Sequence, residues 1–201
     1  MPRSYWRLFQ AIITLFLICA LVGGIVGAVN ALTADIIFDI EREKTETAMR
    51  TVIPEGQLFN EIGDLSGFGF DGNITGFYEA MGEDGKCIGY CVEASPIGFA
   101  SNITLLTGLS PDGIVRGVVI TNCSGETPGL GNRVSEDSFI SQFKGKDSSI
   151  TFITGGAAGA NEVSSITGAT YSSRGVYEGV ASCIRAVISY TAASSTEVPA
   201  K

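Results

Sequence analysis

An apolar run opens the chain. Residues Leu8–Val29 are predominantly apolar, and no charged residue occurs between Arg7 and Asp35. At about 1.5 Å per residue, a helix over this run is about 33 Å long, which matches the hydrocarbon core of a bilayer. The pattern predicts a membrane anchor within residues 1–34, with its span at about 8–29. A signal peptide is the alternative, but its apolar region is typically about 7–15 residues long, so an uncleaved anchor is favoured.

The charges that flank this run predict its orientation. Arg3 and Arg7 precede it, whereas acidic residues such as Asp35 and Asp39 dominate after it. Positive flanks of membrane helices stay in the cytoplasm. We therefore expect a single-pass protein of the cell membrane, embedded in the lipid bilayer, with a cytoplasmic N-terminus and the bulk of the chain on the extracytoplasmic side.

A polar stretch with helical periodicity follows the anchor. Ile36, Ile37 and Ile40 fall roughly on one face, and charged residues fill the other. Pro54 and Gly56 are typical of a helix end. Residues 35–56 are thus predicted to contain a juxtamembrane helix.

Short strands and two helices are predicted in residues 57–190. Glycine-rich turns indicate short strands and loops up to Asp84. Runs rich in β-branched residues predict strands at 87–93, 102–108, 114–121 and 149–154. The turn Ser110–Gly113 would join the second and third of these as an antiparallel hairpin.

The two helices complete the expected fold. Ser135 could cap a helix that runs to Phe143. A stripe of apolar residues predicts a longer helix over 174–190, followed by a flexible tail at 191–201. The stripe consists of Val176, Val180, Ile184, Val187 and Ile188. We expect an α+β domain over residues 57–190, with a mainly antiparallel sheet and packed helices.

Composition excludes several classes of function. The net charge is −8, which disfavours nucleic acid as a partner because phosphate contacts need basic residues. The chain has no histidine, so a Ser-His-Asp triad and histidine metal ligands are absent. The five cysteines do not have the spacing of a zinc or iron–sulfur site, and we expect no metal. We expect buried free thiols. A disulfide from Cys87 or Cys91 to a distant cysteine is the less favoured alternative.

Two stretches could hold a cofactor. Glu126–Gly131 (Glu-Thr-Pro-Gly-Leu-Gly) combines a rigid turn with polar edges, which suits the rim of a flavin ring. Ser164–Ser173 is rich in hydroxyl groups and small residues and leads into the predicted C-terminal helix. Free backbone N–H groups and the helix dipole favour a phosphate at such a helix start. Each stretch alone is only suggestive, because turn-forming loops are common.

Together, the two stretches resemble the FMN-binding domain family. Thr167-Gly168-Ala169-Thr170 is similar to the S/T-G-A-T motif of that family and follows Glu126–Gly131 along the chain. The family includes the G subunit of the Rnf electron-transport complex and the C subunit of the sodium-translocating NADH:quinone reductase. The resemblance implies FMN joined through its phosphate, as a phosphoester, to Thr170. The expected cofactor-binding residues, which come from both stretches, are Thr170, Glu126, Thr127, Gly129, Leu130, Gly131, Thr167, Gly168, Ala169, Ser172 and Ser173.

The resemblance also implies a role and partners. The compact length favours the G subunit of an Rnf-type complex, an electron carrier between ferredoxin and NAD or another carrier in a complex that translocates ions. Its partners would be the other membrane subunits and a flavin transferase that attaches FMN. In such a chain no residue acts as a catalyst on its own, because the flavin does the redox chemistry. A flavoprotein like the quinone-reductase C subunit, a stand-alone extracytoplasmic reductase and a non-redox structural protein of the complex remain alternatives.

Overall fold

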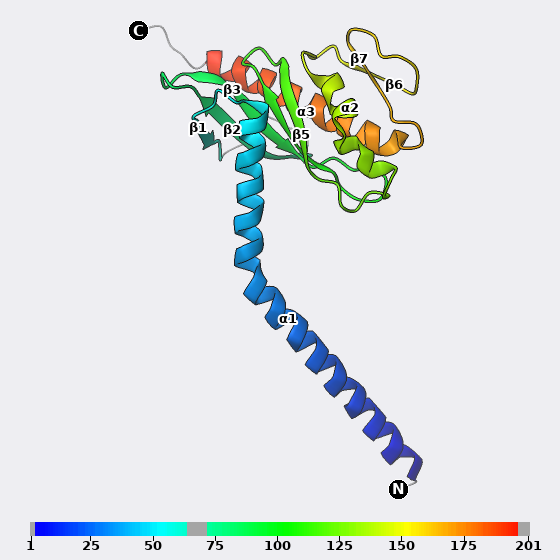
Figure 1. Ribbon diagram of the computed structural model, residues 1–201. Coiled ribbons are helices and arrows are strands. Elements are labelled where there is room, and N and C mark those ends of the chain that lie inside the picture. Colours follow the sequence, from blue (N-terminus) through cyan, green and yellow to red (C-terminus); the bar gives the residue numbers. More distant parts are fainter. Residues whose placement is uncertain (1–2, 64–71, 197–201) are drawn as a thin grey trace. The chain divides into compact units, whose positions relative to one another are not determined.

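The computed structural model (Figure 1) describes residues 3–63 and 72–196. The chain divides into two compact units, Met1–Lys44 and Thr45–Lys201. Helix α1 (Arg3–Val52) contributes to both. Within α1, Phe9–Ala34 has a mean hydropathy of 2.7 and no part of it is buried. Its length and composition are sufficient to cross a membrane, which is compatible with the expected anchor.

The juxtamembrane helix ends where the sequence predicts. α1 stops at Val52, just before Pro54, because proline has no backbone N–H and disfavours the helical conformation of the residue before it. The last turns of α1 bury Ala48, Met49 and Val52. These residues belong to the second unit and form the start of its fold.

The second unit is built on a five-stranded antiparallel sheet. Its strands are β1 (Leu58–Glu61), β2 (Ile74–Met81), β3 (Cys87–Ala94), β4 (Thr104–Leu109) and β5 (Val115–Asn122). They lie in sequence order, and each neighbouring pair is antiparallel. The three strands predicted at 87–93, 102–108 and 114–121 are confirmed as β3, β4 and β5. Residues 64–71 of the expected turn-rich segment lie outside the described residues.

Both faces of the sheet are covered. Successive side chains of a strand point to opposite faces, and neighbouring residues accordingly belong to different cores. Val92, Leu105 and Val118 join a core with helix α3 (Thr170–Thr196), which lies across the sheet (Figure 1). The residues beside them, Cys91, Leu106 and Val119, join a second core with Met49 and Val52 of α1.

A pair of glycines lets α1 approach the sheet closely. Gly108 of β4 pairs with Gly117 of β5. A Cβ at Gly108 would lie 2.7 Å from Cβ of Val52, and one at Gly117 would lie 3.4 Å from its Cα. The sheet therefore has a shallow depression under Val52 that larger residues would fill.

The remaining elements connect the sheet to α3. They are the 3₁₀ helices η2 (Gly131–Ser135) and η3 (Ser141–Phe143), α2 (Asp137–Ile140), β6 (Thr151–Ile153) and β7 (Glu162–Ser164). β6 confirms the strand predicted at 149–154 and pairs with β7 in a parallel two-stranded sheet.

The continuous helix predicted from Ser135 to Phe143 is wrong. Ser135 ends η2, and its hydroxyl donates to Asn132 O instead of capping α2. Phe139 and Phe143 are buried, and a series of short turns places them there. Short helices are marginal by themselves, so packing of these rings against the domain determines the backbone. α3 is longer than the predicted 174–190, because it begins at Thr170 and continues to Thr196.

Candidate cofactor site

A cavity of about 260 Å³ lies at the start of α3. Two segments that are distant in sequence meet there: the loop after β5 and the turn that leads into α3. Seven of the eleven residues expected at a cofactor site line the cavity, namely Thr127, Leu130, Gly131, Gly168, Ala169, Thr170 and Ser172. The two stretches singled out in the sequence thus form one site. Its volume is slightly below the range of about 300–1,000 Å³ typical for drug-sized ligands, so a larger ligand would extend out of it.

The turn before α3 presents backbone donors to this cavity. Gly168 has a φ of +83°, a left-handed conformation that glycine adopts without strain. Ala169 N–H is bonded to Ile166 O, and α3 then begins at Thr170. Ala169 has no side-chain oxygen that could cap the helix. Thr170, Tyr171 and Ser172 form the first turn of α3, where N–H groups lack an intrahelical partner, and all three residues line the cavity. An anion in the cavity could accept hydrogen bonds from such groups.

Glu126 lies beneath the cavity and joins its two sides. Only 2% of the residue is exposed. Oε1 accepts hydrogen bonds from the backbone N–H groups of Phe99 and Ala100, both at 3.0 Å, and of Ser101 at 3.3 Å. Oε2 accepts one from the hydroxyl of Ser172 at 2.5 Å. One carboxylate thus connects the loop before β4 to the first turn of α3.

The protein keeps this carboxylate ionised. Burial by itself would raise the pKa of Glu126, because it disfavours the charged form. The hydrogen bonds from Ser172 and from the backbone N–H groups of residues 99–101 favour the charged form and outweigh burial, so the pKa is lowered. A charged Glu126 acts here as a hydrogen-bond acceptor for the protein, and it does not line the cavity.

Glycines make room for the Glu126 carboxylate. A Cβ at Gly131 would lie 2.6 Å from Oε2 of Glu126 and 2.9 Å from the hydroxyl oxygen of Ser172. A Cβ at Gly98 would collide with Oε1. The Gly131 of the Glu-Thr-Pro-Gly-Leu-Gly stretch is therefore required for packing of the carboxylate, in addition to lining the cavity.

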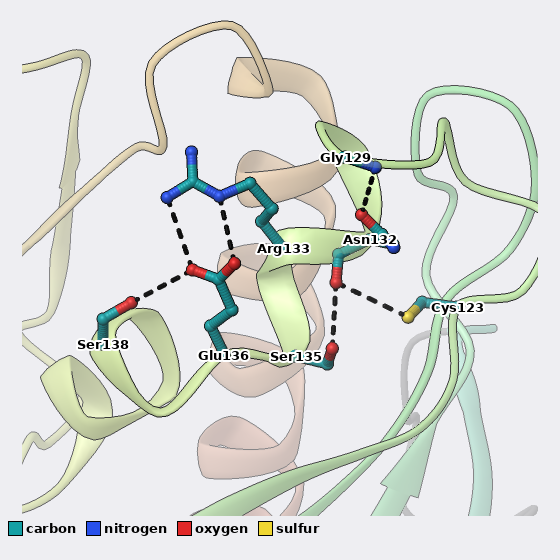
Figure 2. Close-up of polar contacts among 7 residues, drawn as sticks. All are labelled: Cys123, Gly129, Asn132, Arg133, Ser135, Glu136 and Ser138. Atoms are coloured by element: carbon teal, nitrogen blue, oxygen red, sulfur yellow. Dashed lines mark hydrogen bonds and ion pairs between the residues drawn. The ribbon is translucent and has the colours of Figure 1, made fainter.

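The other expected residues surround the cavity without lining it. Ser173 is fully buried, its hydroxyl donates to Ala169 O and accepts from Ile166 N–H, and it braces the turn before α3. Thr167 is exposed on the same turn. Gly129 has a φ of +76°, and its N–H donates to the side-chain oxygen of Asn132, as Figure 2 shows.

The loop between β5 and α2 is held by its own polar contacts. In Figure 2, Asn132 O accepts from the hydroxyl of Ser135 and from the thiol of Cys123. Arg133 pairs with Glu136 at the surface. These contacts fix the course of the chain that follows Leu130 and Gly131 out of the cavity.

Two lining residues were not predicted from the sequence, Phe99 and Tyr171. Both are largely exposed, and their ring centroids are 6.1 Å apart with an interplanar angle of 45°. Leu130 is also partly exposed beside them. The short run Ile97-Gly98-Phe99, which is apolar yet lies between turn residues, is the sequence signal that could have drawn attention to Phe99.

The cysteines are not part of this site. All five lie within the described residues and are free thiols. Cys91 and Cys183 are fully buried. Burial raises the pKa of each to about 12, as expected for unreactive thiols in an apolar core.

Comparisons with known proteins identify relatives that align with most of the chain. Residues 98–185 match the FMN-binding domain family. The chain is 30% identical over 188 residues to the G subunit of the Na(+)-translocating ferredoxin:NAD(+) oxidoreductase complex of Acetobacterium woodii, with 87% of this chain and 89% of the relative covered. It is 29% identical over 173 residues to the G subunit of the proton-translocating ferredoxin:NAD(+) oxidoreductase complex of Clostridium ljungdahlii, with coverage of 86% and 88%.

The fold is also found in a solved structure. NqrC of Shewanella oneidensis aligns with a TM-score of 0.53 and 23% identity, over 61% of this chain and 61% of that chain. The expected α+β fold, an antiparallel sheet with packed helices, is thus confirmed both by the observed topology and by this likeness.

Proposed function

Because the chain belongs to the family of G subunits from Rnf-type ion-translocating oxidoreductase complexes, we propose that it is a membrane-anchored flavoprotein that carries electrons within such a complex. The observation that supports this most strongly is the cavity at the start of α3. It combines the lining residue Thr170, the first-turn N–H groups of a helix and an apolar rim. These are the features needed to hold a phosphate at one end and a flat apolar ring at the other.

The residues of the site fit FMN. The phosphate would lie against the turn 168–170, where backbone donors and the helix dipole favour negative charge. The apolar rim of the cavity would contact the flavin ring, and the cavity is small enough that part of the ring would remain accessible to an electron partner. FMN, when bound, supplies the redox chemistry, and the protein's residues position it.

We propose further that the phosphate is esterified to Thr170. A flavin transferase would catalyse this reaction with a flavin donor whose FMN phosphate is part of a phosphoanhydride. The Oγ of Thr170 loses its proton and bonds to the phosphorus of FMN, the anhydride P–O bond breaks, and the other phosphate of the anhydride leaves and takes up the proton. The net addition to the chain is FMN minus water. A covalent bond keeps the cofactor in place on the extracytoplasmic side, the side that the flanking charges favour, where little free FMN is available to refill an empty site.

The partners follow from the same proposal. An electron carrier needs a donor and an acceptor, and the relatives are named as subunits of ferredoxin:NAD(+) oxidoreductase complexes. We expect the other membrane subunits of an Rnf-type complex to fill these roles. α1 would keep the flavin domain close to them in the bilayer.

A pair of threonine variants tests the attachment. Thr170→Val keeps the shape of the side chain but removes the oxygen that would carry the phosphate. Thr151→Val is the matched control, because Thr151 is exposed on β6, lies outside both stretches and does not line the cavity. After co-expression with a flavin transferase, we expect fluorescence on a denaturing gel for the wild type and Thr151→Val, and none for Thr170→Val. Fluorescence of Thr170→Val would refute the assignment, and a wild type without flavin would favour a structural role.

A further inference from the structure

Three large apolar side chains are exposed together at the mouth of the cavity. Phe99, Leu130 and Tyr171 all line it, yet they remain 66%, 43% and 70% exposed. Single exposed apolar residues are ordinary, whereas a contiguous group at a cavity marks a contact surface. We call this group of three residues the aromatic platform. Its components come from three segments: the loop before β4, the loop after β5 and the first turn of α3.

The geometry of the pair shows how a flat ligand could bind. The ring centroids of Phe99 and Tyr171 are 6.1 Å apart, with planes inclined by 45°, so the two rings already contact each other. A third ring inserted between them would need about 7 Å, twice the carbon contact distance of about 3.5 Å. A flat ligand therefore lies over the pair and is not sandwiched within it.

The platform begins directly beside the expected attachment point. Tyr171 follows Thr170 in the chain. Leu130 approaches the turn so closely that a Cβ at Gly168 would lie 2.7 Å from its Cδ2. A ligand held by its phosphate at Thr170 thus has large apolar surfaces within reach of its other end.

We propose that the platform is the surface on which the flavin ring of the tethered FMN lies, with one face against Phe99 and Tyr171 and the other face open. This inference rests on the proposed function, since it assumes FMN on Thr170. It assigns ring contact to Phe99 and Tyr171, and it accounts for the exposure of both aromatic residues in a domain whose other described aromatic side chains outside α1 are at least half-buried.

Glu126 acts as the positioning residue of this platform. Its Oε1 binds the N–H groups of the loop that carries Phe99, and its Oε2 binds Ser172, the neighbour of Tyr171. The carboxylate thereby fixes the distance between the loop and the helix turn. Glu126 thus holds Phe99 through its backbone N–H and Tyr171 through the neighbouring Ser172, and it does not need to touch the ligand.

Two substitutions test the platform in the full-length, flavin-loaded protein. Phe99→Leu and Tyr171→Leu remove an aromatic ring and keep apolar bulk. Ile97→Ala is the matched control, because Ile97 is 76% exposed on the same loop and does not line the cavity. Intact mass measures FMN occupancy, and flavin emission is compared between the native protein and the same sample denatured in detergent. Emission after denaturation reports the amount of flavin, and native emission reports contact with aromatic rings, which quench it.

The proposal predicts native emission well below denatured emission for the wild type and for Ile97→Ala. Losing one aromatic contact shifts the ratio of stacked to unstacked ring by about two- to tenfold, so native emission rises in Phe99→Leu and Tyr171→Leu at unchanged occupancy. Equal native emission in both variants and the wild type would overturn the platform while leaving the proposed function intact. A wild-type mass without FMN would instead overturn the proposed function, and the platform with it.

Discussion

Glu126→Ala removes the acceptor of four hydrogen bonds from a nearly fully buried position. Of the four donors, the N–H groups of Phe99 and Ala100 belong to exposed residues and that of Ser101 to a partly exposed one, so all three can bind water instead. The hydroxyl of Ser172 cannot, because this residue is only 1% exposed. The substitution therefore leaves one buried polar group unpaired and releases the loop that carries Phe99.

The expected loss of stability follows from these contacts. An orphaned buried hydroxyl costs about 1–3 kcal/mol, and the lost charge-assisted bonds to the loop add about 1–2 kcal/mol after water replaces them in part. The substitution also removes the cost of burying the charged carboxylate, which offsets part of this loss of stability. We expect the free energy of unfolding to fall by about 3 kcal/mol. At about 2–4 °C per kcal/mol for a chain of this size, Tm falls by roughly 6–12 °C.

Thermal unfolding of the detergent-solubilised protein, followed by near-ultraviolet circular dichroism, measures this loss. Glu126→Gln serves as the conservative variant. Its carbonyl oxygen can replace Oε1, and Ser172 can turn its hydroxyl to accept from the amide, so the loss should be about 1 kcal/mol. Glu136→Ala is the control, because Glu136 forms an exposed ion pair with Arg133 that is worth under about 1 kcal/mol. A Tm of Glu126→Ala equal to that of Glu136→Ala would refute the reasoning.

Three further predictions concern the same structure. Folding lowers the pKa of Glu126 from its usual 4.5, so the ionised carboxylate stabilises the protein above about pH 4.5, and this stability is lost as the pH falls. Because Gln does not titrate, Tm should fall less between about pH 6 and pH 3 in Glu126→Gln than in the wild type. Gly131→Ala should lower the free energy of unfolding, measured by denaturant titration, by about 1–3 kcal/mol, because the new Cβ clashes with Glu126. In the control Gly63→Ala, the new Cβ meets nothing within 4 Å, and the free energy should change by under about 0.5 kcal/mol. Cys91 and Cys183 should resist alkylation at neutral pH until the protein unfolds, and mass spectrometry of labelled peptides would detect earlier reaction.

Local signals were sufficient to predict much of the sheet. The β-branched run that became β5 and the turn Ser110–Gly113 predicted a hairpin, and Gly113 indeed has a φ of +77°. Contacts between distant segments were not predictable in this way. The depression formed by Gly108 and Gly117 is defined by Val52, which lies more than fifty residues earlier in the chain. No periodicity within either segment shows that these residues meet.

The same distinction holds for the site: its local features could be predicted from the sequence, and its contacts between distant residues could not. The glycine turn and a helix after it follow from the sequence alone, because turn chemistry and helical periodicity are local, although the helix begins at Thr170 and not at residue 174. The role of Glu126 does not follow from the local sequence, because its hydrogen-bond partners lie 25–27 residues before it and 46 residues after it. The sequence places Glu126 at the flavin edge, whereas the structure places it beneath the cavity as an acceptor for the protein's own donors. Phe99 was missed for the same reason, because its loop reaches the cavity through contacts with distant residues, namely Glu126 and Tyr171.

Intact mass of the full-length protein from its native membranes tests the central claim most directly, with fragmentation of the peptide that contains residues 167–173. The account predicts a mass increase equal to one FMN minus one water, located on Thr170. An unmodified mass, or a flavin located on another residue, would contradict it.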